Sequence, residues 1–516
     1  MSVGSSIIEC MFDSLDEASL LAEMTAGRRA ERSAVARRLM AAGRLCLVRM
    51  ADVEVEDRTQ WCIDNWEAVA AEVGAELGIS RARASSEMNY GLELVVRLPK
   101  LGAAMAAGEV DFRVISVVVF RTGLIVDPQV LAAIDARLAA AARSWNGLSR
   151  RKIVELVDWR VRELDPAAER AARGVDEDRH VEINPSEGGL AQFWGAVRAA
   201  DAAVLDRRLD ALAGSVCAED SRTKRQRRAD ALAVLAAGVD SLVCDCGSEQ
   251  CPAAGAAAPA QVVIHVVAEA ATVSGESATP GQSARPGQSA RPGYLPGFGA
   301  VAAETVRDLA TRAHLRPLKP AQEFTAEPQY RPSTALAEFI RARDLCCRFP
   351  GCEVPAEFCD LDHSIPWASG GPTHPSNLNC KCRAHHLLKT FWCGDNGWAE
   401  QQHPDGTLVF TSPSGRTYTT TPGGALFFPQ LATPTETLTP DTLATDTLAT
   451  GAPRATSGPG RTLMMPTRKR TRAAERAARI AWERGLNEAR WAADPHPSRK
   501  LADFLKLDLH LGDLTA

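Results

Sequence analysis

The sequence predicts a multidomain α+β protein, in which a large, mainly α-helical N-terminal domain with a few strands precedes a small metal-braced domain and disordered linkers. Helix-period patterns recur between residues 15 and 160. Seven of the fourteen cysteines lie between Cys346 and Cys393, together with several histidines. Two segments have low-complexity composition, and 516 residues exceed the usual length of one domain. These observations together predict at least two folded units.

The composition favours helices and limits the possible partners. Aromatic residues make up only 5% of the chain and alanine is abundant, as is typical of helices that pack through small side chains. The formal charge of −5 gives no global attraction to nucleic acid, so any contact with a polyanion must use local basic surface. The N-terminus lacks the pattern of a secretory signal, and no apolar run reaches the ~18 residues of a membrane span. We therefore expect a cytoplasmic protein without membrane contact.

Turn residues divide the N-terminal helical pattern. Residues 77–125 are expected to form three short helices, broken near Gly78, Pro99 and Gly108. Residues 70–89 weakly resemble a helix-turn-helix, but a helical hairpin within a bundle is the favoured interpretation. Further along, the patterns predict two strands in 179–197, helices in 198–214 and 222–243, and a strand in 260–270.

A second group of cysteines follows these helices, with Cys244, Cys246 and Cys251 in the segment "CDCGSEQC". The three thiols lack a clear fourth ligand, so incidental loop cysteines are favoured over a zinc site.

The segments have the following expected boundaries. They are an N-terminal tail (1–14), a mainly helical domain (15–320) with a disordered Pro/Gly/Ser repeat insertion (274–293), a ligand-rich domain (331–392), a short β-rich extension (393–428), a disordered Thr/Pro-rich linker (429–465) and a basic helical tail (466–516). Residues 466–500 carry ten Lys/Arg against four Asp/Glu. Two interpretations of this tail stay open, a solvated helix with i,i+4 ion pairs or an arm that contacts phosphates.

Two short knuckles in the ligand-rich domain have the spacing of a structural zinc site. The predicted ligands are Cys347 and Cys352 in "CRFPGC", and Cys382 and His385 in "CRAH". Cys347 is preferred over its neighbour because the Arg-Phe-Pro-Gly turn brings it back toward Cys352. The nearby thiols that complicate this assignment are Cys346, Cys359 and Cys380.

Four further residues, which the predicted zinc site does not use, are suited to phosphodiester cleavage. They are Asp362, His363, Asn377 and His386. An imidazole with a pKa near ~6.5 can activate water at neutral pH, and a carboxylate with an imidazole can hold a divalent ion. An Asn carbonyl can orient the base by accepting its other N–H. A helix beginning near Arg383 would place His385 and His386 about 100° apart, so that each faces a different metal.

Residues 331–392 resemble an HNH endonuclease domain, the ββα-metal nuclease fold in its zinc-knuckle form. The resemblance rests on "RARDLCCRFPGCEVPAEFCDLDHSIPWASGGPTHPSNLNCKCRAHHLLKTF", and Cys380 departs from the usual apolar residue. It implies that His363 is the general base, oriented by Asn377 or, less favoured, Asn379. It also implies that Asp362 and His386 hold a catalytic Mg²⁺ or Mn²⁺, and that Lys389 and Arg383 contact phosphate.

The preceding helical region resembles the domain of unknown function found before HNH domains in actinobacterial repeat-family proteins, on segments such as "YLPGFGAVAAETVRDLA". The leading hypothesis is a metal-dependent endonuclease acting on DNA, most simply double-stranded, with RNA as an open alternative. The second is a catalytically silent zinc module that binds DNA or protein, and the third a zinc clasp between domains.

Overall fold

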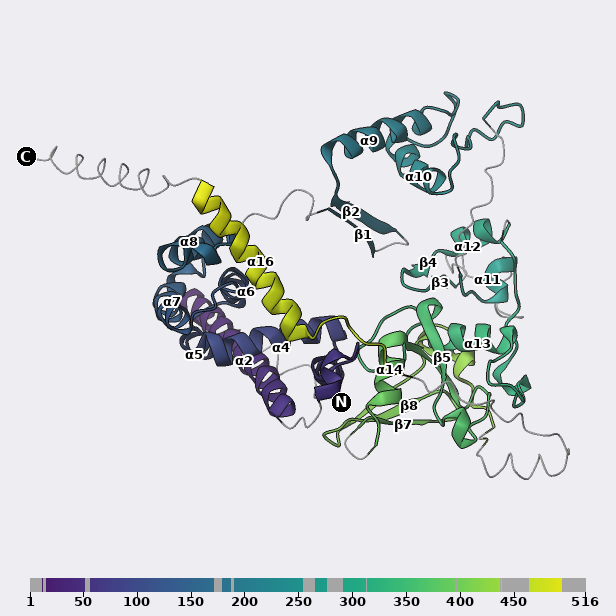
Figure 1. The fold of residues 1–516 in the computed structure, drawn as a ribbon. Helices are drawn as coiled ribbons and strands as arrows, with labels where there is room; N and C mark the ends of the chain where they lie inside the picture. The colour runs from purple at the N-terminus through teal and green to yellow at the C-terminus, as the bar shows by residue number, and fades with distance from the viewer. Residues whose placement is uncertain are drawn as a thin grey trace, which may run out of the picture.

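The computed structural model describes residues 15–51, 56–170, 179–186, 190–253, 265–275, 291–311, 313–394, 397–436 and 464–493, together with Phe12 and Leu438. The predicted tail (1–14), repeat insertion (274–293) and Thr/Pro-rich linker (429–465) lie largely outside these residues. The described part is mainly helical with small separate sheets (Figure 1). None of its helices is long and apolar enough to cross a membrane.

Consecutive helices form the N-terminal region. They are α2 (Glu17–Ala51), α3 (Asn65–Leu77), α4 (Arg81–Leu92), α5 (Pro99–Ala106), α6 (Phe112–Arg121), α7 (Pro128–Ala141) and α8 (Arg150–Leu164). The expected breaks are present: Gly78 ends α3 in a left-handed conformation, and Pro99 is the first residue of α5. Gly108, also with positive φ, precedes Asp111, which caps α6.

The α3–α4 pair is a hairpin of the bundle, as the favoured interpretation predicted. Both helices pack against α2 through a shared apolar cluster that includes Cys46, Val73 and Met88. Helices α2 and α4 cross so closely that a Cβ atom on Gly91 would lie 1.8 Å from the carbonyl oxygen of Leu39. A larger residue at Gly91 would therefore force the two helices apart.

Small elements connect this bundle to the C-terminal unit. They are β1 (His180–Pro185), β2 (Ala191–Ala196), α9 (Ala199–Ala213), α10 (Lys224–Ala236), α11 (Ala270–Ser274), β3 (Gly293–Leu295), β4 (Gly299–Val301) and α12 (Ala303–Ala310). Strands β1 and β2 form the predicted antiparallel hairpin. Of the strand predicted in 260–270, residues 260–264 lie outside the described residues, and Val267 forms an isolated bridge with Tyr294 before α11 begins.

The C-terminal unit surrounds a hairpin and a helix. Its elements are α13 (Thr334–Asp344), β5 (Cys359–His363), β6 (Leu378–Cys382), α14 (Arg383–Phe391), β7 (Ala399–Gln402), β8 (Leu408–Thr411) and β9 (Thr417–Thr420). Its apolar core includes Phe339, Leu378 and Phe410, and it extends to Ile63 and Ala71 of the N-terminal region. The indole N–H of Trp392 also donates to the carbonyl of Ile63 (2.9 Å). The C-terminal core therefore includes side chains from α3 and the segment before it.

A buried ion cluster fixes the loop that carries Cys347 and Cys352. Asp344 accepts hydrogen bonds from Arg343 (2.8 Å) and Arg348 (3.1 Å), and all three side chains are buried. The second oxygen of Asp344 accepts from the backbone N–H of Cys380 (2.8 Å). Because both guanidinium groups bind the one carboxylate and direct further N–H groups to backbone carbonyls, α13, the loop after it and β6 are held in one arrangement.

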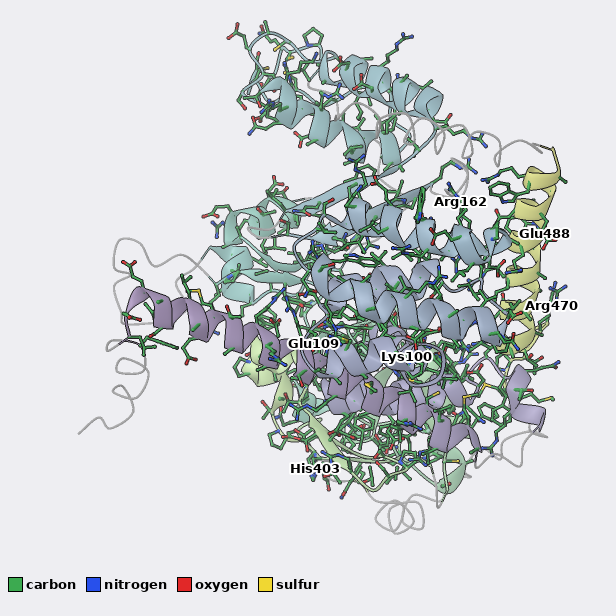
Figure 2. The ribbon with its side chains drawn as sticks, turned by 90° about the vertical axis from the view of Figure 1, so that its left-hand side faces the viewer. Lys100, Glu109, Arg162, His403, Arg470 and Glu488 are labelled. Atoms are coloured by element: carbon green, nitrogen blue, oxygen red, sulfur yellow. The ribbon has the colours of Figure 1, made fainter. Side chains whose placement is uncertain are left out.

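The basic C-terminal helix α16 (Arg472–Ala493) lies along the N-terminal helices in both views (Figure 1, Figure 2). Its arginines pair with carboxylates more than 300 residues earlier, for example Arg472 with Glu67 (2.6 Å) and Arg476 with Glu93 (2.6 Å). Neither open interpretation of this segment anticipated such pairing. The helix is docked on the fold, and these arginines neutralise the protein's own acids.

We expect Arg484→Ala to lower the free energy of unfolding by about 1–3 kcal/mol. The guanidinium donates to both oxygens of Asp165 (2.7 and 3.2 Å) and to the carbonyl of Leu124 (3.1 Å), and both side chains are largely buried. Arg479→Ala, on the same helix, is the matched control because the Arg479 side chain is exposed and its ion pair with Glu483 is long (3.9 Å). Urea unfolding of the two variants checks this, and equal midpoints would contradict docking through Arg484.

Candidate functional site

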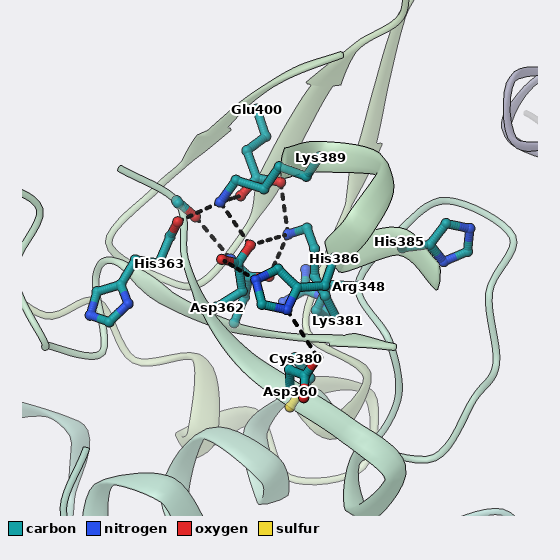
Figure 3. Close-up of polar contacts among 12 residues, drawn as sticks. Arg348, Asp360, Asp362, His363, Cys380, Lys381, His385, His386, Lys389 and Glu400 are labelled. Atoms are coloured by element: carbon teal, nitrogen blue, oxygen red, sulfur yellow. Dashed lines mark hydrogen bonds and ion pairs between the residues drawn. The ribbon is translucent and has the colours of Figure 1, made fainter. Parts of the chain in front are cut away.

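The site is built on β5, β6 and α14, which lie next to one another (Figure 3). The two strands are antiparallel, with Asp362 opposite Asn379 and His363 opposite Leu378. Helix α14 begins directly after β6, so that Cys382 is its N-terminal flanking residue. The side chains of the β5–β6 hairpin therefore lie next to the first turns of α14.

The four predicted zinc ligands come together at one end of this unit. The ligand atoms of Cys347, Cys352, Cys382 and His385 all lie within 4.8 Å of one another. His385 Nδ1 is 3.5 Å from Cys347 Sγ and 3.3 Å from Cys382 Sγ. Zn–S bonds of about 2.3 Å in a tetrahedron separate two sulfurs by about 3.8 Å, so the spacing fits such an ion. This cluster could hold a metal ion such as zinc.

The surroundings of the cluster favour metal binding. The ring of His385 is stacked on Phe349 (4.1 Å between centroids), and its Nε2 is buried without a hydrogen-bond partner, so Nδ1 is the nitrogen that faces the thiols. Burial alone would raise the pKa of Cys347, but hydrogen bonds from its neighbours Cys352, Cys359, Cys382 and His385 hold it well below the ordinary thiol value. Cys347 is therefore suited to bind as a thiolate.

The neighbouring cysteines that complicated the assignment have other environments. Besides its contact with Cys347, the Cys359 thiol lies within hydrogen-bond distance of the carbonyls of Val354 and Pro355. Cys380 is fully buried, and Cys346 forms a backbone bridge with Pro355. None of these three belongs to the four-ligand cluster.

Asp362 and His386 face each other on the other side of α14 (Figure 3). His386 Nδ1 is 2.9 Å from Asp360 Oδ2, and its Nε2 is 3.5 Å from Asp362 Oδ1. If Nδ1–H donates to Asp360, then Nε2 points a lone pair at the Asp362 carboxylate. The ring nitrogen and the carboxylate oxygen can both act as metal ligands, so this arrangement suits a shared divalent cation. Asp360 would orient the imidazole.

Two lysines, Lys381 and Lys389, and Glu400 surround the Asp362 carboxylate. Lys381 and Glu400, like Asp360, were not predicted from the sequence to be site residues. Lys389 Nζ is 2.7 Å from Asp362 Oδ2 and 3.0 Å from Glu400, and it also donates to the His363 carbonyl. Lys381 is fully buried and pairs with Glu400 (2.7 Å). Burial alone would raise the pKa of Asp362, but the charges of Lys381, Lys389 and His386 hold it below its ordinary value.

These contacts correct the expected role of Lys389, which neutralises carboxylates of its own chain and is not directed at a substrate phosphate. Arg383 differs, since its side chain is 69% exposed and pairs with the half-exposed Asp360 (3.1 Å). Of the two predicted phosphate contacts, Arg383 alone presents its charge to solvent.

The ring of His363 is held in one orientation. It is only 4% exposed, is stacked on Tyr330 (5.2 Å) and lies away from the Asp362–His386 pair in Figure 3. Its Nε2 is 2.9 Å from Thr373 Oγ1, whose own proton goes to the Gln329 carbonyl (2.7 Å). Nε2 must therefore be the protonated nitrogen, which leaves a lone pair on Nδ1. Burial lowers the pKa of His363 to about 4, so the ring is neutral at pH 7.

Asn377 does not orient His363, contrary to expectation, because Thr373 has that position. The Asn377 side chain accepts from the backbone N–H of Ile365 (2.7 Å) and donates to the carbonyls of Ile365 and Pro372 (both 3.0 Å). It closes the loop between β5 and β6. The alternative, Asn379, binds Ser364 (2.9 Å) and Lys381 (2.6 Å).

A second buried histidine in this loop, His374, makes stability depend on pH. Its Nε2 donates to the Phe324 carbonyl (3.1 Å) and its Nδ1 accepts from the Ser376 N–H (3.2 Å), an arrangement that needs the neutral ring. Burial lowers the pKa of His374 below 6.5, so below pH 6.5 the unfolded state binds more protons than the folded state.

We therefore expect the unfolding free energy to fall as the pH drops below 6.5, by at most about 1.4 kcal/mol per pH unit from this residue. His374→Gln should show a smaller loss than the wild type between pH 7.5 and 5.5 in urea unfolding. The comparison of the two chains cancels the effect of acid on the thiol clusters. Equal losses would mean that His374 does not contribute.

Comparison with known proteins shows the family of this chain. A family model described as "Domain of unknown function (DUF222)" matches residues 26–344. The uncharacterized protein Rv2100 of Mycobacterium tuberculosis is 43% identical over 512 residues, which cover 93% of this chain and 90% of the relative. The uncharacterized protein Rv3776 of the same organism is 44% identical over 484 residues, covering 91% and 90%.

No solved structure matches the chain. The family match spans most of the N-terminal helices, the connecting elements and α13, so it agrees with the resemblance to a domain of unknown function, and it continues past the expected boundary at residue 320. The chain belongs to the DUF222 family.

Proposed function

We propose that this protein is a metal-dependent endonuclease of the HNH type, which hydrolyses phosphodiester bonds in double-stranded DNA. One observation carries the proposal: a neutral imidazole with a free lone pair, His363, directly follows the carboxylate of a carboxylate–imidazole pair, Asp362 and His386. Hydrolysis of a phosphodiester requires a base and a divalent-ion site, and the end of β5 supplies His363 for the first and Asp362 for the second. The β5–β6–α14 arrangement supports the ββα-metal assignment.

The chain's own residues supply the base chemistry. His363 Nδ1 takes a proton from water, the resulting hydroxide forms a bond to phosphorus, and the bond from phosphorus to the 3′ oxygen breaks. The leaving 3′ oxygen takes a proton from solvent, and His363 returns its proton to solvent. Thr373 holds Nε2–H during this transfer and stabilises the imidazolium that forms. Asp362 and His386 would hold Mg²⁺ or Mn²⁺, which when bound neutralises the charge that develops on the phosphate and the leaving oxygen.

The Cys347, Cys352, Cys382 and His385 cluster would hold a structural zinc ion. Four protein ligands close the coordination shell, so no position remains for substrate. The cluster joins the loop after α13 to the start of α14 and thereby fixes the helix that carries His386. The zinc therefore supports the site without taking part in the reaction.

Substrate contacts would come from the exposed rim of the site. Arg383, at the first turn of α14, has a free face for a phosphate. Tyr330 is 52% exposed and covers the His363 ring, so its outer face is available to a sugar or base. We propose that the DUF222 helices position the DNA.

A second candidate function is a catalytically silent zinc module that binds DNA or protein. It is favoured by the ammonium group of Lys389, which lies on Asp362 Oδ2 and already neutralises that carboxylate. A site neutralised in this way has less need of a divalent cation.

Cleavage of supercoiled plasmid by the purified full-length chain decides between the two. The zinc-loaded protein would be incubated with Mg²⁺, with Mn²⁺, or in metal-depleted buffer, and its zinc content measured afterwards. The nuclease predicts nicked or linear product only with added metal, and His386→Ala should lose it while His403→Ala, at the exposed turn before β8, keeps it. No cleavage with either metal by zinc-loaded protein would support the binding module, and gel shifts would then test for DNA.

A further inference from the structure

The hairpin of α9 and α10 has little apolar core of its own. Its buried apolar side chains among the described residues 199–253 are Leu212, Ala213, Ala231 and Leu242. A unit of this size with so few buried groups needs an additional constraint, such as a metal or a cross-link, to hold one structure. Figure 1 shows the two helices side by side, with their loops at the same end.

Four cysteines meet where these loops come together. Cys217 follows α9, and Cys244, Cys246 and Cys251 follow α10. Their sulfur atoms all lie within 4.8 Å of one another, and Cys217 Sγ is 3.4 Å from Cys244 Sγ. All four side chains are half-buried. This spacing is close to the sulfur separation of about 3.8 Å around a tetrahedral zinc ion.

Hydrogen bonds that do not involve sulfur hold the two loops in register. Arg222 donates to Asp220 (2.8 Å) and to the Val243 carbonyl (2.7 Å). Asp220 also accepts from the backbone N–H of Asp245 (2.9 Å), and Ser215 accepts from that of Leu242 (2.9 Å). The thiols are therefore brought together by a built scaffold on both sides of the cluster.

We propose that Cys217, Cys244, Cys246 and Cys251 form a second structural zinc site. The sequence favoured incidental cysteines because the fourth ligand was not evident, and the structure supplies it from a position 27 residues before Cys244. Zinc binding would displace the thiol protons and tie the end of α9 to the loop after α10. Four thiolates leave no open position, so the ion is structural.

A zinc ion explains the geometry better than two disulfides do. Disulfides would join the sulfurs as separate pairs with bonds of about 2.05 Å, and nothing would then keep the two pairs together. All four sulfurs are instead mutually close, as ligands around one centre must be. The thirteen described cysteines are also all free thiols in this structure.

Counting zinc in the full-length chain tests the proposal. The chain would be saturated with zinc under reducing conditions, freed of loosely bound metal, and analysed by mass spectrometry for zinc per chain. The wild type should hold two ions, and Cys217→Ser and Cys382→Ser should hold one each. Their combination should hold none. Cys393→Ser, an exposed thiol outside both clusters, should keep two.

Cys217→His keeps a zinc ligand at that position and should retain two ions, which separates ligand loss from misfolding of the serine variant. Replacement of zinc by Co²⁺ in the wild type should give thiolate-to-metal absorption for two cobalt ions per chain. One zinc ion in the saturated wild type, or two in Cys217→Ser, would overturn the proposal. Because no step measures DNA cleavage, a failure here is distinct from a failure of the proposed nuclease.

Discussion

His363→Ala is expected to lower the rate of plasmid cleavage by about 10²–10⁴-fold, the range that a positioned general base contributes. The variant removes the lone pair on Nδ1 that accepts the proton from water. It leaves both metal clusters untouched, since neither contains His363. Initial rates of nicking at saturating Mg²⁺ or Mn²⁺ would measure the loss, with zinc content as the check on folding.

His403→Ala is the matched control, because it makes the same substitution at an exposed turn. It should cleave at the wild-type rate. Thr373→Val tests the orientation of the base, because it leaves Nε2–H without its acceptor and frees the ring to change tautomer. We expect an intermediate loss for this variant. Cleavage by His363→Ala at the wild-type rate would show that another group activates the water.

The low pKa of His363, about 4, gives this test an independent measure. A solvated imidazole would lose activity as the pH falls through its ordinary value of 6.5, because its protonated form cannot accept a proton. The buried ring should stay neutral in that range. The wild-type rate is therefore expected to change little between pH 7.5 and 6, and a fall centred at 6.5 would contradict the buried environment.

The Cys/His cluster and the hairpin–helix were predictable because their signals are local. Cys347 and Cys352 are five positions apart, Cys382 and His385 three, and short spacings of soft ligands limit the possible geometry. Breaks at Gly78 and Pro99 depend on backbone conformations that adjacent residues determine. The pattern also placed His385 and His386 on one helix.

The rest of the site depends on contacts between distant segments. Thr373 and Glu400 reach the site residues from a loop and from β7, and no spacing rule connects them to His363 or Lys381. Asp360 could have been predicted from the sequence, because it precedes Asp362 by two positions and therefore lies on the same face of β5. The docking of α16 could not be predicted from the sequence, because Arg472 pairs with residues about 400 positions earlier.

The helix that carries His386 gives the second large prediction, since its position depends on the knuckle cluster. Cys382→Ser is expected to release zinc from this cluster and to destabilise the C-terminal unit by more than about 3 kcal/mol. The lower bound is conservative, because structural zinc contributes roughly 10–16 kcal/mol to the smallest zinc-dependent folds. Cys382 also lies in the apolar core, where it ends β6 and flanks the start of α14, so the loss should reach both elements.

Cys346→Ser is the appropriate comparison, because Cys346 adjoins a ligand but lies outside the four-ligand cluster. It should keep its zinc and unfold within about 1 kcal/mol of the wild type, as substitutions away from special features do. Thermal unfolding followed by tryptophan fluorescence reports on the unit through Trp398, which packs on Phe349 beside His385. If Cys382→Ser kept full zinc and melted with the wild type, the ion would have other ligands, and the argument that zinc positions His386 would fail with it.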